Sequence, residues 1–359
     1  MLSDFNFRSN GIGFLRFFFA SMVIWSHTFN LGGFGMEPIS RLTKGVEDGG
    51  TIAVDGFFVL SGFLIARSNE QTSSLARYLW HRVLRIFPGF WACLAVVAFG
   101  FAPILFFHET GTLAGFLGSP NPPWRYITDN LTLQMNQFGI AGLLGTLPYP
   151  WLFNHSLWTL QYEFYCYLAV GILGALGVFN RRPVLALVPL AIVLALFAAS
   201  SSIRGLLNVP TALRVVELYA FFAIGACAYL FRKYVPMRAS LTLACAAGIG
   251  VFVTTRAYGI VLPLCLSYIT LYAAMFLPIR SFDRPMDLSY GLYIYAFPIQ
   301  QALAEYQLNA FGFLPYFVAA FGITLIFAAC SWFGIEARGL SLKDASFAPW
   351  AMRLRGRGA

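Results

Sequence analysis

Long apolar runs, separated by short polar connections, divide the whole chain. Runs of roughly 17–25 residues match the length at which a helix crosses a bilayer. We expect ten such spans, at about residues 11–30, 51–67, 84–106, 152–178, 184–203, 212–231, 239–255, 259–278, 288–305 and 313–335. The pattern therefore predicts an all-α integral membrane protein, a bundle of about ten transmembrane helices.

Composition supports this interpretation. Hydrophobic residues make up 58% of the 359 residues and charged residues only 11%, whereas a soluble domain carries about a quarter charged residues. Because no long polar segment is present, the chemistry has to come from the helices and their loops. We expect a transmembrane domain over residues 1–340 and a basic cytoplasmic tail over residues 341–359.

The formal charge of +9 gains meaning from its location. Most of the 24 Lys and Arg residues fall in every second connection between the predicted spans. Basic connections stay on the cytoplasmic side, so we expect both termini there and no nucleic-acid partner. The six cysteines lie in the predicted spans without a CxxC or Cys/His cluster, which predicts neither disulfides nor a metal site.

The first span carries Arg16 and His27, eleven positions apart. On a helix they share one face, about 16 Å apart along the axis. A charge within the membrane costs about 2.5–3.5 kcal/mol, which favours a cavity wall that compensates for it. The alternative is a snorkelling arginine and a histidine at the membrane surface.

Two carboxylates extend this hypothesis. Asp55 opens the second span at the depth of His27, so it is a candidate partner that orients the imidazole; alternatively it only caps its helix. Glu163 falls near the middle of the fourth span, on one face with Ser156, and is a candidate partner for Arg16. A glutamate at that depth is difficult to explain by structure alone.

Three further features remain open between structure and function. Arg82 and Arg85, one helical turn apart, fit either a topology signal or a clamp for diphosphate. In the ninth span, Asp287 or Ser289 is a candidate N-cap and Pro298 a kink. The long outer loop, about residues 107–151, is either a cover or a lid over the outer mouth.

Six motifs in order resemble those of the membrane-bound acyltransferase family 3, the integral-membrane O-acyltransferases of bacterial glycans. The resemblance covers nearly the whole chain. The matching residues are Arg16 and His27 of an Arg-x10-His motif; Phe57, Phe58, Ser61, Gly62, Phe63 and Leu64 of FFxxSGFL; Arg82, Arg85, Ile86 and Pro88 of RxxRIxP; Ser156, Leu157, Trp158, Leu160 and Glu163 of SLWxLxxE; Ser289, Tyr290, Tyr293 and Pro298 of a late tyrosine motif; and Ile335 and Glu336. Ala296 stands where many members have histidine, which concentrates the predicted chemistry on His27.

The resemblance implies transfer of an acyl group, commonly acetyl, from cytoplasmic acyl-CoA to a hydroxyl of a cell-surface or exported saccharide, such as lipopolysaccharide or exopolysaccharide. Acyl-CoA is then a co-substrate, and no cofactor is bound permanently. His27 would act as general base or transient acyl carrier, together with Arg16, Asp55 and Glu163. Arg82 and Arg85 would hold the CoA phosphates. Secondary candidates are Ser61, Ser156 and Tyr290.

The implied location is the bacterial cytoplasmic membrane, with lipid and, on the outer side, a periplasmic protein as further partners. A transporter or flippase of a glycan or lipid-linked substrate is the competing class, because buried charges also mark transport paths. Against it, the sequence shows neither an internal repeat nor a pair of matching broken helices. A membrane anchor, the third possibility, leaves Arg16 and Glu163 unexplained.

Overall fold

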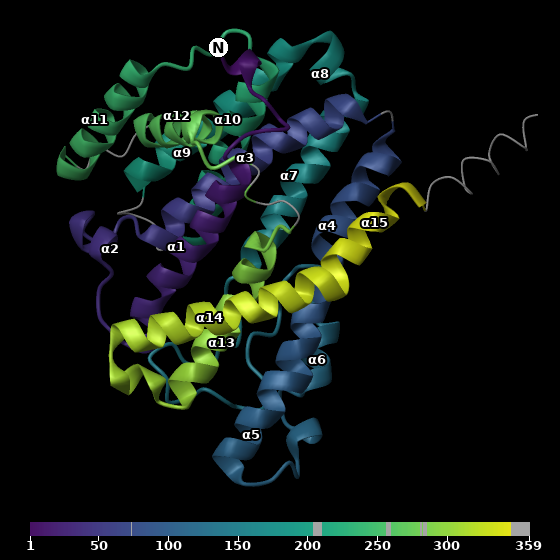
Figure 1. Ribbon diagram of the computed structural model, residues 1–359, viewed down its shortest axis with the longest axis vertical. Helices are drawn as coiled ribbons and strands as arrows, with labels where there is room; N and C mark the ends of the chain where they lie inside the picture. Colours follow the sequence, from purple (N-terminus) through teal and green to yellow (C-terminus); the bar gives the residue numbers. More distant parts are fainter. Residues whose placement is uncertain (73, 204–209, 256–259, 281, 283–285, 346–359) are drawn as a thin grey trace, which may run out of the picture. The chain divides into compact units, whose positions relative to one another are not determined.

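The computed structural model describes residues 1–72, 74–203, 210–255, 260–280, 282 and 286–345, and every regular element in these ranges is a helix (Figure 1). The predicted all-α class is therefore confirmed. The chain forms two compact units. The first comprises Met1–Ser26, Met36–Leu75 and Tyr162–Asp287; the second comprises His27–Gly35, Ala76–Gln161 and Leu288–Ala359.

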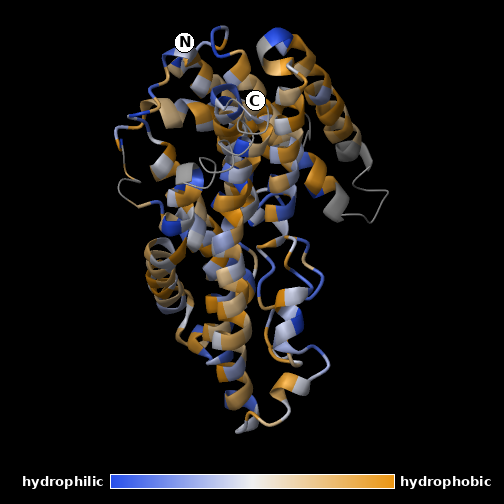
Figure 2. Cartoon of the chain, turned by 90° about the vertical axis from the view of Figure 1, so that its right-hand side faces the viewer, coloured by the Kyte–Doolittle hydropathy of each residue, from blue (hydrophilic) through white to orange (hydrophobic). Residues whose placement is uncertain are grey.

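Each of the ten predicted ranges coincides with helical residues. Five helical segments are long and apolar enough to cross a membrane: Ile12–Gly32, Gly49–Gln71, Leu75–Thr110, Leu213–Leu230 and Phe313–Lys343. Three shorter apolar helices lie at Pro183–Ala199, Ala239–Val251 and Val261–Phe276. Figure 2 shows the hydrophobic residues running along the helices, while the hydrophilic ones gather at helix ends and loops. These features indicate a membrane protein, and the count of ten crossings remains a prediction.

The first unit is built around a close helix pair. Its helices are α2 Pro38–Leu42, α3 Gly49–Gln71, α8 Val178–Arg181, α9 Leu187–Ile203, α10 Pro210–Leu230, α11 Ala239–Thr255, α12 Val261–Phe276, and most of α1 Ile12–Gly32 and α7 Trp158–Ala175. α3 runs beside α10 (Figure 1). A Cβ at Gly62 would lie 2.1 Å from the Phe222 carbonyl oxygen, and one at Gly225 would lie 2.1 Å from that of Val59. Small residues thus let the two backbones approach closely.

The second unit is built around α13, Ser289–Glu305, where fifteen of seventeen residues are buried. Its other helices are α4 Leu75–Val96, α5 Ala102–Thr110, α6 Pro123–Thr128, α14 Phe313–Ser331 and α15 Ala337–Ala345. Short helical turns lie in this unit at Val97–Phe101, Phe116–Gly118, Leu308–Phe311 and Trp332–Glu336. A further short turn, Leu2–Asp4, belongs to the first unit. α13 packs on α14, where a Cβ at Gly291 would meet the Ala328 backbone at 2.7 Å. α13 is therefore the core helix of this unit.

Several predicted boundaries were wrong. Helical structure runs from Leu75 through a π-helical turn at Val97–Phe101 to Thr110, so the helix begins well before residue 84 and contains both Arg82 and Arg85. The fourth span begins at Trp158 and not at residue 152. Tail residues 346–359 lie outside the described residues.

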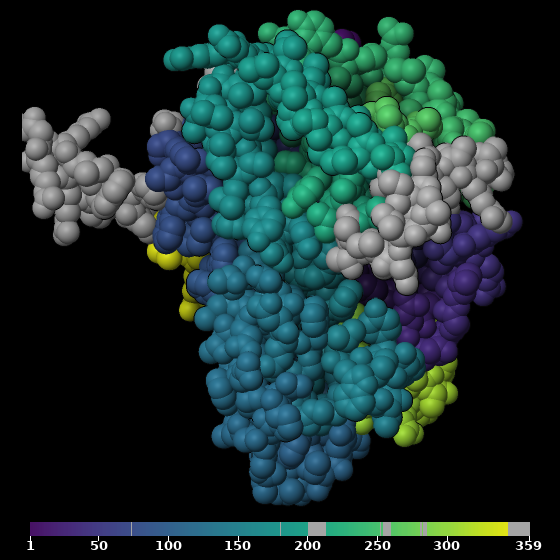
Figure 3. Space-filling model, turned by 180° about the vertical axis from the view of Figure 1, so that it is seen from behind, coloured from purple at the N-terminus to yellow at the C-terminus, as the bar shows by residue number. Residues whose placement is uncertain are grey.

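The long loop after α5 is folded onto itself, and Figure 3 shows it in blue and teal as a closely packed mass of side chains. Asn130, fully buried, organises it. Its amide nitrogen donates to the carbonyls of Tyr126 at 2.9 Å and Gln137 at 2.7 Å, and its Oδ1 accepts from the Asn136 backbone at 2.7 Å. The loop is thus a fixed structure, as a covering segment requires.

Candidate active site

The predicted site residues divide between the two units. The first unit holds Arg16, Asp55, Ser61 and Glu163, and the second holds His27, Arg82, Arg85, Ser156 and Tyr290.

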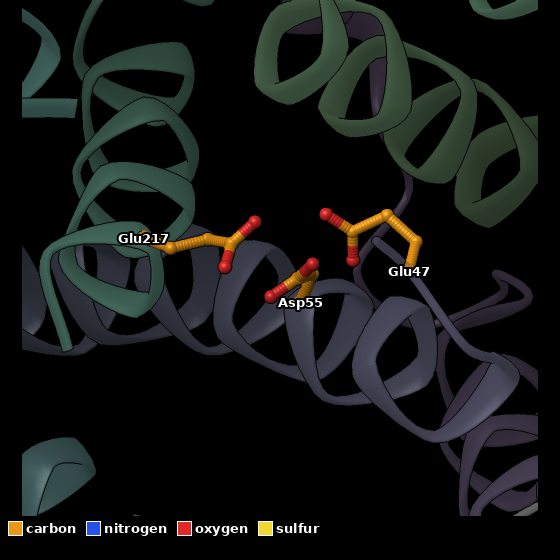
Figure 4. Close-up of side chains that lie close together, drawn as sticks. All are labelled: Glu47, Asp55 and Glu217. Atoms are coloured by element: carbon orange, nitrogen blue, oxygen red, sulfur yellow. The ribbon is translucent and has the colours of Figure 1, made fainter. Parts of the chain in front are cut away.

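Asp55 lies in a buried charge cluster of the first unit (Figure 4). It is 1% exposed, and the Arg214 Nη2 lies 2.9 Å from its Oδ1. The same guanidinium contacts Glu217 at 2.7 Å and donates to the Thr51 carbonyl at 3.0 Å. Arg214 and Glu217 lie three positions apart on α10, so helical spacing alone brings this pair together. Asp55 thus has a cationic partner that no local pattern reveals, and its role toward His27 remains a prediction.

Glu47 completes the cluster. Its carboxylate points toward those of Asp55 and Glu217 in Figure 4, and one oxygen from each lies within 4.8 Å of the others. Carboxylate oxygens at this spacing are ligands suited to hard cations. The Arg214 guanidinium already supplies positive charge to two of the three carboxylates. The cluster therefore resembles an internal ion-pair network as much as a metal centre.

Glu163 accepts two hydroxyl hydrogen bonds on the same oxygen. Ser61 donates to its Oε1 at 2.9 Å and Tyr167, one turn later on α7, at 2.5 Å. The two hydroxyls are 3.2 Å apart. Charge-assisted bonds of this length are the strong kind, so the carboxylate is fixed in place. Ser61 acts here as a donor to Glu163.

Arg16 pairs with Asp287 and not with Glu163, so the expected partner was wrong. The Nη1 of Arg16 donates to the Asp287 Oδ2 at 2.5 Å. Both side chains are partly exposed, at 22% and 14%. Asp287 therefore does not cap α13, whose N-cap is Leu288. The intramembrane cation has a counter-charge, which is what its energetic cost requires.

In the second unit, Pro298 determines how α7 meets α13. Proline lacks the N–H that would bond to the carbonyl four residues earlier, which frees the carbonyl of Ile294. Asn154 donates to this oxygen at 2.8 Å, and the Cys93 thiol donates to it at 3.2 Å. Asn154, fully buried, thereby fixes its neighbour His155 near α13.

The following residues of α13 hold the segment around His27. Gln300, fully buried, donates from Nε2 to the Thr28 hydroxyl at 3.0 Å. Gln301 donates to the carbonyls of Tyr149 at 2.7 Å and Leu152 at 2.8 Å. The end of α1 and the segment before α7 are thus anchored on adjacent α13 residues.

Between these anchors lies Phe297. Its ring centroid is 5.5 Å from that of His27, edge to face, and 6.5 Å from that of His155. Both imidazoles therefore flank one aromatic ring. His155 precedes α7, and burial lowers its pKa, so this imidazole is neutral at pH 7.

Ser156 contributes its backbone to the same junction. Its carbonyl accepts from the Tyr293 hydroxyl at 2.9 Å, and that hydroxyl lies 2.6 Å from the Thr159 Oγ1. The Ser156 side chain is buried, and within the described chain its Oγ has no hydrogen-bond partner. Ser156 therefore anchors the start of α7 through its main chain.

Arg82 and Arg85 are half-buried on α4. The Arg85 guanidinium lies 5.8 Å from the ring centroid of Tyr290, and that of Arg82 lies 5.8 Å from the ring of Tyr78. Tyr290 donates its hydroxyl to the Ile86 carbonyl at 2.7 Å. Tyrosine rings thus lie beside the guanidinium groups of both residues.

Sequence reasoning did not identify Arg214 as the partner of Asp55 or Asn154 as the donor to the Ile294 carbonyl. It also did not identify Phe297 as the ring between the imidazoles of His27 and His155. The sequence contained one usable signal. Pro298 indicates that the Ile294 carbonyl lacks its helical hydrogen bond, but it does not indicate which residue donates to that oxygen instead.

Comparison with known proteins agrees with this architecture. A family model described as an acyltransferase domain matches residues 9–333. The chain therefore belongs to the membrane-bound acyltransferase family 3. It is similar to a protein of Shigella phage Sf6 named O-acetyl transferase, with 29% identity over 353 residues, covering 93% of this chain and 97% of that protein. No solved structure matches the chain.

Proposed function

We propose that this protein transfers an acyl group, most simply acetyl, from cytoplasmic acyl-CoA to a hydroxyl of a cell-surface or exported saccharide. The family match over residues 9–333 carries this proposal, because it identifies the chain as an acyltransferase. The name of the phage relative supports an acetyl group and an oxygen acceptor.

His27 is the proposed catalytic group. Attack on a thioester requires the acceptor hydroxyl to lose its proton, and an imidazole supplies general-base help of about 10²–10⁴-fold. Alternatively His27 attacks first, displaces CoA and carries the acyl group to the hydroxyl. In either route a carboxylate would stabilise the imidazolium, and Asp55 and Glu163 are the candidates that the sequence offers.

Arg82 and Arg85 are the proposed donor site. Acyl-CoA carries a diphosphate and a 3′-phosphate, and guanidinium groups bind such oxygens in pairs. The spacing of one turn on α4 and the tyrosine supports hold both side chains toward one side of that helix. Arg16, paired with Asp287, is proposed to line the donor's path.

The proposed location is the bacterial cytoplasmic membrane, crossed several times, with both termini inside. The five long apolar helices and the membrane family support it. Acyl-CoA is cytoplasmic, so the donor enters from within, and the folded loop after α5 is proposed to cover the outer, acceptor side. A periplasmic partner would then receive the product.

The test is the O-acetyl content of envelope and secreted glycans, measured by proton NMR. Cells that lack the protein are complemented with wild type, His27→Ala or the control His108→Ala, whose histidine is exposed on α5. We expect acetyl signals with wild type and the control and none with His27→Ala, at equal membrane abundance.

Other outcomes overturn parts of the proposal. Acetylation by His27→Ala at the wild-type level would assign the histidine to structure. Unchanged acyl signals in every strain, with a change in glycan export, would favour a transporter instead.

A further inference from the structure

A group of aromatic rings surrounds His155 in the second unit. Ring centroids of Phe138, Tyr149, Trp158 and Phe297 lie 5.8, 6.3, 6.3 and 6.5 Å from its imidazole. Three of these residues come from the segment around the start of α7 and one comes from α13. We call these four residues the aromatic wall.

The residues of the aromatic wall differ in solvent exposure. Phe297 is 2% exposed, whereas Phe138, Tyr149, Trp158 and His155 are only partly buried. A ring cluster within the close-packed interior would be buried throughout. This cluster instead leaves three aromatic side chains and one imidazole partly exposed.

The aromatic wall is also held rigidly. Tyr149 is tied to Gln301 through its carbonyl, His155 follows the buried Asn154, and both anchors lead to α13. Such support is what a binding site needs, because each group it positions in advance reduces the entropy lost on binding.

His27 adjoins the aromatic wall through Phe297. The Phe297 ring contacts both imidazoles, and it also lies 6.1 Å from the ring of Tyr149. A molecule seated against the aromatic wall would therefore lie beside the group proposed to activate a hydroxyl.

We infer that the aromatic wall is the acceptor site: it stacks against one pyranose ring of the saccharide, while His155 hydrogen-bonds a sugar hydroxyl and turns the ring toward His27. This inference rests on the proposed function. The apolar C–H face of a pyranose matches an aromatic ring, and its hydroxyls require polar partners. A neutral imidazole offers both a donor and an acceptor nitrogen to such hydroxyls. His155 is thus a substrate-binding residue, and His27 keeps the chemical step.

The test separates acceptor binding from donor binding. The probes are acetyl-CoA and the envelope polysaccharide of a strain lacking the protein, freed of O-acetyl groups by mild base. Purified full-length protein in lipid nanodiscs is titrated with each probe by calorimetry. The variants are Trp158→Ala and His155→Phe, and the matched controls are Trp124→Ala, an exposed tryptophan on α6, and His108→Phe.

We expect Trp158→Ala to weaken polysaccharide binding by about tenfold or more, the loss expected when one stacking contact is removed. His155→Phe keeps a ring but loses the hydrogen bond, so it should reduce glycan acetylation in cells more strongly than it reduces binding. Acetyl-CoA binding should match wild type in both variants and in both controls.

Polysaccharide binding by Trp158→Ala and His155→Phe at the level of the controls would overturn the assignment. Loss of acetyl-CoA binding together with polysaccharide binding would also overturn it, because the aromatic wall would then be structural. If wild type binds neither probe and acetylates nothing, the proposed function itself fails. Wild type that acetylates glycans while the variants bind normally leaves the proposed function intact and removes only the acceptor site.

Discussion

At the scale of single residues, Arg214 balances more negative charge than any local sequence pattern suggests. It contacts the carboxylates of both Asp55 and Glu217, and a third carboxylate, that of Glu47, lies beside them. Removing one partner of a buried pair leaves a charge that the surroundings cannot solvate. How strongly a substitution destabilises the protein therefore depends on which buried charge it leaves without a partner.

We expect Arg214→Gln to be far more damaging than Asp55→Asn. The first substitution leaves the buried carboxylates of Asp55 and Glu217 without the guanidinium that pairs with both, at a cost of about 3–5 kcal/mol. The second leaves Arg214 paired with Glu217. Thermal unfolding of the detergent-purified variants measures the difference, and equal melting temperatures would contradict this account of the cluster.

Glu163 gives a second prediction at this scale. Tyr167→Phe removes one of two hydroxyl donors and should cost about 1.5–3 kcal/mol, the value of a hydrogen bond to a charged group. Tyr162→Phe on the same helix is the control. Acetyl transfer by Tyr167→Phe should fall while its membrane abundance remains measurable; activity equal to the control would show that Glu163 does not depend on this donor.

At the scale of helices, one backbone feature stands out in the packing of each unit. In the first unit, α3 and α10 approach so closely that added Cβ atoms would overlap carbonyl oxygens at Gly62 and Gly225. In the second, the carbonyl freed by Pro298 ties α13 to the start of α7. A backbone carbonyl oxygen takes part in each contact, so side-chain volume alone does not describe them.

The close approach of α3 and α10 predicts that alanine is tolerated at some glycine positions and not at others. Gly62→Ala and Gly225→Ala should force the helices apart and sharply reduce folded protein in the membrane. Gly322→Ala on α14 is the control, because nothing lies within 4 Å of the added Cβ. Quantitative blots of membranes measure the outcome, and wild-type abundance for Gly62→Ala would contradict the close approach.

The Pro298 junction allows a double-mutant test. Asn154→Ala removes a donor from the Ile294 carbonyl and should cost about 1–3 kcal/mol. Pro298→Ala adds an N–H to an oxygen whose two lone pairs already serve Asn154 and Cys93. The double variant should regain thermal stability through this N–H, yet remain poor in acetylation because His155 has lost its anchor. Additive losses of stability would refute the coupling.

At the scale of the whole molecule, the sequence predicts what depends on composition and local spacing. Apolar length located the helices, and the pairing of Arg214 with Glu217 follows from three positions on one helix. Partners 159 or 140 positions apart, such as Arg214 for Asp55 and Ile294 for Asn154, depend on which helices pack together. The π-helical turn that joins α4 to α5 has no signal in hydropathy.

Topology is the prediction that belongs to this scale. In a Cys330→Ala background, Leu117→Cys after α5 should react with a membrane-impermeant maleimide in intact spheroplasts. Tyr234→Cys after α10 should react only after permeabilisation; both side chains are exposed. Labelling of Tyr234→Cys in intact cells would reverse the assigned orientation.

The anchoring of Asn154 on Ile294 has a consequence for how the protein is made. Ribosomes add about 5–20 residues per second, so the 140 positions between these two residues take roughly 7–28 seconds to synthesise. During that time the segment around His155 is already translated, while the helix that organises it does not yet exist. The proposed acceptor side is therefore completed late, after most of the chain has been synthesised, and we expect nascent chains that stop before α13 to be inactive.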